Sequence, residues 1–159
     1  MRDLQAGDWP EAARIYAEGI ATGNATFETE VPSWERWERS HLPAHRLVAE
    51  EDGRVVGWIG LAPVSERPCY AGVAEISVYV TESARGQGVG SKLLVAVVES
   101  SERSGIWTLQ TSVFPENEPS LALLRRFDFR TVGTRERIGR LHGVWRDTIL
   151  VEGRSEVVR

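Results

Sequence analysis

The sequence predicts an α/β or α+β domain with a mixed, mostly antiparallel central sheet flanked by helices. Two observations support this fold class. Helix-like and strand-like segments follow one another in the order α-α-β-β-β-α-β-α-β-β. The dipeptide Asp52-Gly53, between two strand-like runs, is typical of a tight hairpin turn. At 159 residues the chain has the length of one domain, so residues 1–159 are expected to form a single unit.

Two helices are expected near the N-terminal end. Asp8 can cap the first, a proline suits its first turn, and apolar residues then recur at helical spacing: Ala12, Ile15, Tyr16 and Ile20. Glycine, asparagine and proline make residues 22–32 a loop. Ser33 then opens a short helix with Trp34 and Trp37 on one side.

Periodicity and turn residues predict the remaining elements in the same way. They are two strands within residues 46–63, a strand at 72–80, a helix over Gly88–Arg103, a strand at 106–114 with Trp107, Leu109, Thr111 and Val113 on one face, a helix from Asn117 to Phe127, and strands at Phe129–Glu136 and Val144–Glu152.

Composition and charge exclude several classes of protein. The chain is 42% hydrophobic with a net charge of −4 and interleaved charges, so it lacks the basic face of a nucleic-acid binder. Its apolar runs are far shorter than the roughly 20 residues of a membrane helix, and the N-terminus has no signal-peptide pattern. We therefore expect no nucleic-acid or membrane partner and a cytoplasmic protein.

Cysteine and histidine usage speaks against a metal site. Cys69 is the only cysteine, which excludes a disulfide within the chain and a thiolate-rich zinc site. It is expected to be a small buried apolar residue rather than a nucleophile, because no base is evident beside it. The three histidines, His41, His45 and His142, lack metal-ligand spacing, so no metal is expected.

The most informative stretch is the glycine-rich turn R-G-Q-G-V-G, residues 85–90, between a strand and a helix. It is not a P-loop, since Lys92 follows Ser91 rather than glycine, and the same Ser91 replaces the third glycine of a dinucleotide fingerprint. The first N–H groups of a helix lack partners and attract anions, glycines let the backbone approach closely, and Arg85 adds a planar cation. The turn therefore predicts a diphosphate cradle; a plain strand-to-helix turn is the alternative.

With this turn in place, the chain resembles the GNAT superfamily of N-acetyltransferases over most of its length. The runs TFETEVP, AEISVYV, NEPS and GVWRDTILVE resemble the phosphinothricin/methionine sulfoximine acetyltransferase branch. The resemblance implies acetyl-CoA as cosubstrate. Its pantetheine arm would pair with the backbone of Val78, Tyr79 and Val80, and its pyrophosphate would be bound by Arg85, Gly86, Gln87, Gly88, Val89 and Gly90. Asn117 and Ser120 would contact the arm as well. Asn117 alone is also a good helix cap.

The reaction of that family is attack of an amine on the acetyl thioester. Because amines arrive largely as ammonium, a base must remove a proton. Glu75 is the first choice, as a charge within an apolar strand is either at an exposed edge or functional. Glu28 would bind the ammonium or relay a proton, unless it is only a solvated loop charge, and Phe27 would shape the pocket. Arg67 and Tyr70 are candidates to hold an acceptor carboxylate, although a surface arginine is the commoner case.

Two positions depart from the family pattern. Leu124 stands where many members have a Tyr or His that protonates the leaving thiolate, and leucine cannot donate a proton. Either the thiolate leaves unprotonated, or Tyr79 or water supplies the proton. Asp128 stands at a usual glycine, where aspartate tolerates a left-handed backbone.

These observations predict an acetyl-CoA-dependent N-acetyltransferase acting on a small amino acid or analogue. A peptide or protein N-terminus is the alternative acceptor, but it needs an open groove, whereas the Phe27-Glu28 loop and the helix with Trp34 and Trp37 would enclose something small. A non-catalytic acyl-CoA-binding module is the third possibility, suggested by Leu124. The branch resemblance and the six tryptophans suggest a homodimer.

Overall fold

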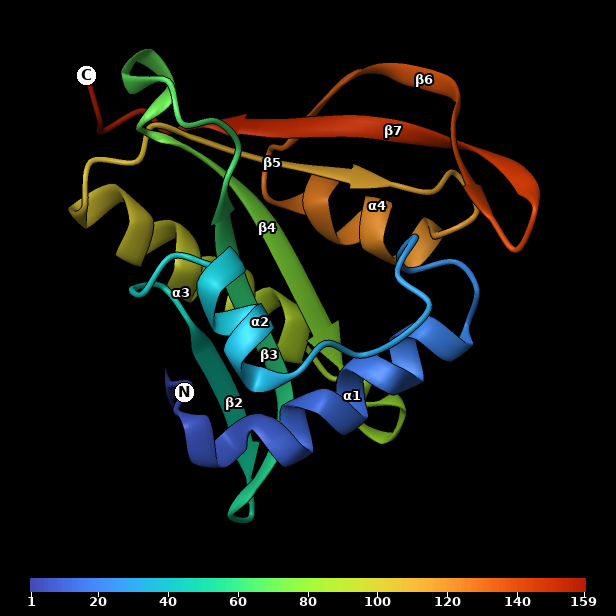
Figure 1. The fold of residues 1–159 in the computed structure, drawn as a ribbon. Helices are drawn as coiled ribbons and strands as arrows, with labels where there is room; N and C mark the ends of the chain where they lie inside the picture. The colour runs from blue at the N-terminus through green and yellow to red at the C-terminus, as the bar shows by residue number, and fades with distance from the viewer.

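A computed structural model describes all 159 residues and contains a seven-stranded mixed sheet in the order β1-β2-β3-β4-β5-β7-β6 (Figure 1). Only β4 and β5 run parallel, and every other neighbouring pair is antiparallel, which confirms the expected fold class. The strands are β1 (Arg2–Asp3), β2 (Leu47–Glu51), β3 (Arg54–Pro63), β4 (Val73–Val80), β5 (Thr108–Val113), β6 (Arg130–Leu141) and β7 (Val144–Arg154).

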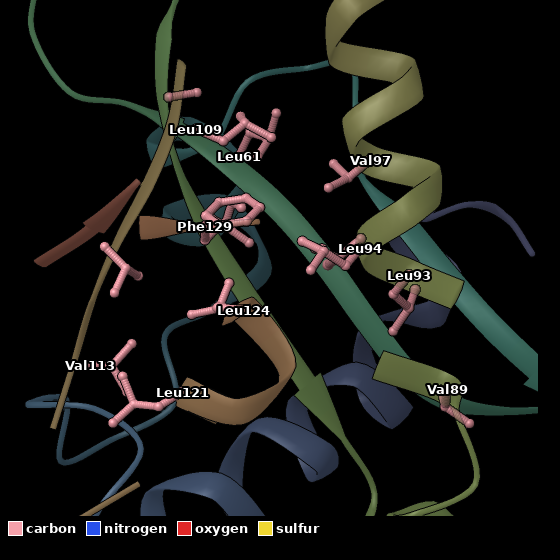
Figure 2. Packing of buried hydrophobic residues seen from close by; sticks show 14 of the residues in the cluster. Leu61, Val89, Leu93, Leu94, Val97, Leu109, Val113, Leu121, Leu124 and Phe129 are labelled. Atoms are coloured by element: carbon pink, nitrogen blue, oxygen red, sulfur yellow. The ribbon is translucent and has the colours of Figure 1, made fainter. Parts of the chain in front are cut away.

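Four α-helices cover the two faces of the sheet. They are α1 (Trp9–Ala21), α2 (Trp34–Ser40), α3 (Val89–Arg103) and α4 (Glu118–Arg126). Leucines and valines of α3 and α4 pack with Leu61 of β3 in the larger core (Figure 2), which also includes Ile59 of β3 and Ile76 of β4. On the opposite face, α1 and α2 form a second core around Trp37 and Trp58. None of the helices is both long and apolar enough to cross a bilayer.

The turns and most caps follow from the residues that form them. Asp52 and Gly53 adopt φ of 50° and 76°, as the hairpin between β2 and β3 requires, and Asp128 has a left-handed φ of 62°. The Ser33 Oγ accepts a hydrogen bond from the Arg36 N–H at 3.2 Å. Asn117 Oδ1 likewise accepts from the Ser120 N–H at 3.4 Å.

Three details differ from the prediction. Asp8 precedes α1 but does not cap it, because its carboxylate accepts hydrogen bonds from the Arg2 guanidinium and the Gln5 N–H. The short strand β1, which pairs with β2, has no signature of its own in the sequence. Strand β6 continues to Leu141, rather than ending at Glu136, because it follows β7 to the tip of their hairpin.

The single parallel pair creates the feature that positions the site. β4 and β5 are in register only from Val73 to Glu75, opposite Thr108 to Gln110. β3, in contrast, accompanies β4 as far as Val80. Beyond Glu75 the two strands therefore separate, and one edge of β4 has no neighbouring strand.

Candidate active site

A cavity of about 920 Å³ opens where β4 and β5 separate. Its wall comes from the end of α1 and the α1–α2 loop, β4, the glycine turn and the start of α3, the end of β5, residues along α4 from Pro119 to Arg126, and one residue of β7. Most of the residues singled out from the sequence lie in this wall: Phe27, Glu28, Glu75, Val78, Tyr79, Val80, Arg85, Gly86, Gly88, Val89, Gly90, Asn117 and Ser120.

The free edge of β4 presents only alternate backbone groups to the gap. The Thr81 N–H donates to the Val56 carbonyl at 2.8 Å, in register with the β3–β4 ladder. By the alternation of an antiparallel pair, the backbone of Tyr79 faces β3, whereas Val78 and Val80 face the gap. An extended ligand could therefore pair with Val78 and Val80, whereas Tyr79 has only its side chain to offer.

The glycine turn adopts the conformation that its residues permit. Gly86 and Gly88 have φ of 73° and 83°, in the left-handed region, and a Cβ at either would meet no atom within 4 Å. Gly88 is the N-cap of α3, so the first N–H groups of the helix, which have no partner within it, belong to the cavity wall. The Arg85 Nε donates to the Val80 carbonyl at 3.2 Å, which leaves its terminal nitrogens without partners.

Gln87 differs from its neighbours, because its side chain donates to the Ser83 carbonyl at 3.1 Å and it does not line the cavity. The rest of the turn fits an anionic ligand: left-handed glycines, the first amides of the helix and the free terminal nitrogens of Arg85 meet at one place. Together with the free edge of β4, this end of the cavity suits a long ligand whose anionic part is a diphosphate.

Glu75 lies where β4 and β5 begin to separate. Glu75 is exposed to the cavity, and partial desolvation by the surrounding walls raises the pKa of Glu75 above its usual range. The Arg135 guanidinium on β6 acts in the opposite direction. β4 lies between β3 and β5, and Glu75 itself pairs with Gln110 of β5. The charge of Glu75 is therefore not explained by a position on an edge strand of the sheet.

The α1–α2 loop closes the cavity on the side of Glu75. The Glu28 N–H donates to Thr26 Oγ1 at 3.1 Å, and the Glu28 carboxylate raises the pKa of both Tyr16 and Tyr79, for which burial is the larger cause. The Tyr79 ring stacks on Tyr16 and Trp58, with centroids 4.7 Å and 5.0 Å apart.

An arginine holds this loop in place. Arg146 of β7 donates to the Gly23 carbonyl at 2.9 Å and to Asn24 Oδ1 at 2.8 Å, and it also contacts the Glu116 carboxylate. Its guanidinium lies 4.1 Å from the centroid of the Phe114 ring, against which Phe27 packs edge-on. The loop with Phe27 and Glu28 is therefore fixed to the far end of the sheet.

Helix α4 supplies the remaining wall. Leu124 is 2% exposed and packs in the larger core with Val113 and Phe129 (Figure 2). This packing explains why an apolar residue is tolerated there, and it leaves no proton donor at that position.

Some expected residues are not brought to the cavity. Arg67 and Tyr70 lie in the connection between β3 and β4, outside the cavity wall, with the Arg67 guanidinium 5.6 Å from the centroid of the Tyr70 ring. Trp34 and Trp37 do not enclose the cavity, because both pack against α1 in the second core. Cys69 is exposed rather than buried, because it lies in the same surface connection as Arg67.

Other residues of the site carry no recognisable signal in the sequence. Ser112, Phe114 and Thr148 line the cavity, and Arg146 holds its loop. They lie together because β5 and β7 are neighbours, although their segments are well apart in the chain. Only knowledge of the strand order, which spacing does not provide, would have brought them together.

Comparison with known proteins agrees with this geometry. Residues 4–129 match the acetyltransferase (GNAT) family. A phosphinothricin N-acetyltransferase of Alcaligenes faecalis is 33% identical over 162 residues, covering 96% of this chain and 80% of the relative. An L-methionine sulfoximine/L-methionine sulfone acetyltransferase of Pseudomonas aeruginosa is 28% identical over 158 residues, covering 96% and 92%.

Solved structures share the fold over nearly the whole chain. A GNAT phosphinothricin acetyltransferase from Sinorhizobium meliloti in complex with acetyl-CoA superposes with a TM-score of 0.87 at 28% identity, covering 96% of this chain and 86% of that one. A ribosomal-protein-alanine N-acetyltransferase from Brucella melitensis gives 0.89 at 27% identity, covering 97% and 98%.

The chain therefore belongs to the acetyltransferase (GNAT) family of acetyl-CoA-dependent N-acetyltransferases. Within that family it is similar to the branch of phosphinothricin and methionine sulfoximine acetyltransferases.

Proposed function

We propose that this enzyme transfers the acetyl group of acetyl-CoA to the amine of a small free amino acid or analogue, of the phosphinothricin or methionine sulfoximine type. The observation that carries the proposal is the position of Glu75. It lies where β4 and β5 begin to separate, in the same cavity as the glycine turn. A base and an anion cradle thus border one continuous space, and the named relatives act on small amino acid analogues.

The proposed roles follow from chemistry and placement. Acetyl-CoA supplies an acetyl group activated as a thioester. Val78 and Val80 pair with its pantetheine arm, and Arg85 with the turn of residues 86–90 binds its pyrophosphate. Asn117 and Ser120 at the start of α4 contact the arm, a role compatible with the cap that Asn117 forms.

At the acceptor end, two carboxylates meet the incoming ammonium. Glu75 takes its proton, directly or through water, and the raised pKa of Glu75 brings its basicity nearer to that task. Glu28 attracts the ammonium and Phe27 limits the size of its side chain. The roles expected for Arg67 and Tyr70 stay a prediction, to which the position of these residues lends no support.

The leaving group is proposed to depart without a side-chain acid. Leu124 has no proton to give, and a thiol has a pKa near 8.5, so a thiolate is an acceptable leaving group. Tyr79 is a poor donor, because burial raises its pKa well above the ordinary value. We expect Tyr79→Phe to lower kcat by less than about tenfold; a loss of about 10²-fold or more would assign it the acid role.

The proposal is tested by thiol release from acetyl-CoA with a panel of amines. The panel contains L-phosphinothricin, L-methionine sulfoximine, L-methionine sulfone, the common amino acids, and simple amines. We expect free amino acids or their analogues to be the best substrates. Absence of thiol release with every amine, from folded protein that binds acetyl-CoA by calorimetry, would instead support a non-catalytic acyl-CoA-binding module.

The structural similarity to a ribosomal-protein-alanine N-acetyltransferase supports a second candidate, acetylation of a peptide or protein N-terminus. Short peptides that begin with alanine, compared with free alanine, separate the two acceptor classes. The attachment of the α1–α2 loop to β7 through Arg146 favours the smaller acceptor, because it keeps that side of the cavity closed.

A further inference from the structure

One buried hydroxyl in the cavity wall has no hydrogen-bond partner. Thr148 of β7 is 4% exposed, its Oγ1 is unpartnered, and it lines the cavity. The two other buried polar side-chain atoms without partners are the indole nitrogens of Trp37 and Trp58, which lie in the aromatic core away from the cavity. Since an unpaired buried hydroxyl is costly, the position of Thr148 points to a ligand atom as its missing partner.

Thr148 lies on the same face of the sheet as Glu75. Its neighbour Ile149 packs toward the larger core, so Thr148 faces the opposite side of the sheet. On β4, Ala74 and Ile76 belong to the larger core, and Glu75 between them therefore faces the same side as Thr148. A molecule bound between the α1–α2 loop and this face can meet both residues.

The charge beside Thr148 is positive. Arg135 is its register partner on β6, so the two side chains project to the same face, and Arg135 has no ion pair or side-chain hydrogen bond. Arg135 is also the charge that acts on Glu75. The other arginine nearby, Arg146, is already bonded to Gly23, Asn24 and Glu116.

A hydroxyl on the same sheet face as a guanidinium without an ion pair suits an anionic oxygen, whereas the ammonium of the acceptor has Glu75 and Glu28 as partners. We infer that Thr148 donates a hydrogen bond to a carboxylate oxygen of the acceptor, next to the charge of Arg135. Thr148 then makes the enzyme select amino acids over simple amines. This inference rests on the proposed function and gives its acceptor a second, anionic anchor.

The test compares Thr148→Val, which keeps the shape and removes the hydroxyl, with Thr148→Ser, which keeps the hydroxyl. The probes are L-methionine sulfone and 3-(methylsulfonyl)propylamine, the same molecule without its carboxylate. Acceptor KM is measured in the thiol-release assay, and acceptor binding is measured by calorimetry without coenzyme. A thermal melt of each variant gives a third measurement that needs no ligand.

Thr148→Val is expected to raise both the KM and the Kd for L-methionine sulfone about tenfold or more, with kcat and the KM for acetyl-CoA unchanged. Values for the propylamine should not change, and Thr148→Ser should stay close to the wild type. The melting temperature of Thr148→Val should be equal to or higher than that of the wild type, because an unpartnered polar group has been removed from a buried place.

The outcomes separate this inference from the proposed function. If the wild type is active and Thr148→Val leaves the KM for L-methionine sulfone unchanged, the inference is wrong but the proposed function stands. The same holds if Thr148→Val raises the KM values for the sulfone and for the propylamine by the same factor. A clearly lower melting temperature of Thr148→Val would reveal a structural partner for the hydroxyl and would overturn it as well. If the wild type neither binds nor acetylates any free amino acid of the panel, the proposed function fails too.

Discussion

Glu75 is the residue whose replacement tests the chemistry most directly. Glu75→Gln keeps the shape of the side chain and removes its basicity, so kcat is expected to fall about 10²–10⁴-fold. The Kd for acetyl-CoA, measured by calorimetry, should stay the same, because Glu75 lies away from the glycine turn along β4. Glu99→Gln, on the exposed side of α3, is the matched control and should leave both quantities unchanged. Full activity of Glu75→Gln would remove this residue from the mechanism.

The pH profile provides a second test at the same residue. The pKa of Glu75 is raised by desolvation, so this base becomes protonated and inactive at a higher pH than an ordinary glutamate, whose pKa is about 4.3. The acidic limb of kcat/KM should therefore lie above that value. Arg135→Gln removes the charge that opposes the shift, and it should move the limb to still higher pH. A limb that Arg135→Gln leaves in place or moves to lower pH would contradict this assignment.

At the scale of elements, a role of the glycine turn in ligand binding can be distinguished from the effect of backbone strain on stability. Gly88 and Gly105 have nearly the same left-handed φ, 83° and 80°, and neither would place a Cβ within 4 Å of another atom. Alanine at either position should cost about 1–2 kcal/mol of stability, measured by denaturant unfolding. Only Gly88 lines the cavity, where the methyl group would occupy space proposed for the pyrophosphate.

Calorimetry with CoA should therefore distinguish the two variants. We expect Gly88→Ala to weaken CoA binding about tenfold, a difference of about 1.4 kcal/mol, and Gly105→Ala to leave it unchanged. Equal binding by both variants, or by a variant with bulky residues at Gly88 and Gly90 together, would show that the turn does not hold the diphosphate.

Local rules of sequence were sufficient for most elements. The positive φ of Asp52 and the caps at Ser33 and Asn117 depend on neighbouring residues alone, and each was predicted; the left-handed backbone at Asp128 followed from the family resemblance instead. Asp8 shows the limit, because its carboxylate accepts from Arg2 and from the Gln5 N–H, both of which precede it, instead of capping the helix that follows. Residues whose roles depend on strand order were not predicted.

The candidate site likewise has a part that local sequence predicts and a part that only the folded sheet assembles. The β4 strand and the glycine turn are contiguous in the chain, so a pattern could reveal them. The acceptor side is assembled from the α1–α2 loop, β5 and β7, and its residues Arg146 and Thr148 gain their surroundings only in the folded sheet. The tryptophans Trp34 and Trp37 have the size and polarity of either a pocket wall or a core, and packing against α1 decided between the two.

At the scale of the whole molecule, we propose that the enzyme is a homodimer that uses the β6 edge of the sheet. β6 is exposed along most of its length and has no outer neighbour, so its unpaired backbone groups can pair with a second copy. The β6–β7 hairpin also exposes the apolar side chains of Val132, Ile138, Val144 and Trp145.

Light scattering after size-exclusion chromatography should give twice the mass of the 17.7 kDa chain. Ile138→Lys should yield a folded monomer, because it places a charge at the proposed contact, whereas Val95→Lys on the exposed face of α3 should remain dimeric. A wild type that is monomeric at every concentration tested would refute the dimer.

The separation of β4 from β5 has a consequence for the protein before its coenzyme arrives. The two halves of the sheet are joined along only a short seam, at Val73 to Glu75. An extended ligand that lies between β4 and β5 would connect the two halves beyond this seam. Amide hydrogens of Val78 and Val80 should exchange with solvent rapidly in the free enzyme and more slowly once CoA is bound. Binding of the coenzyme would then make the two halves of the sheet move as one rigid unit.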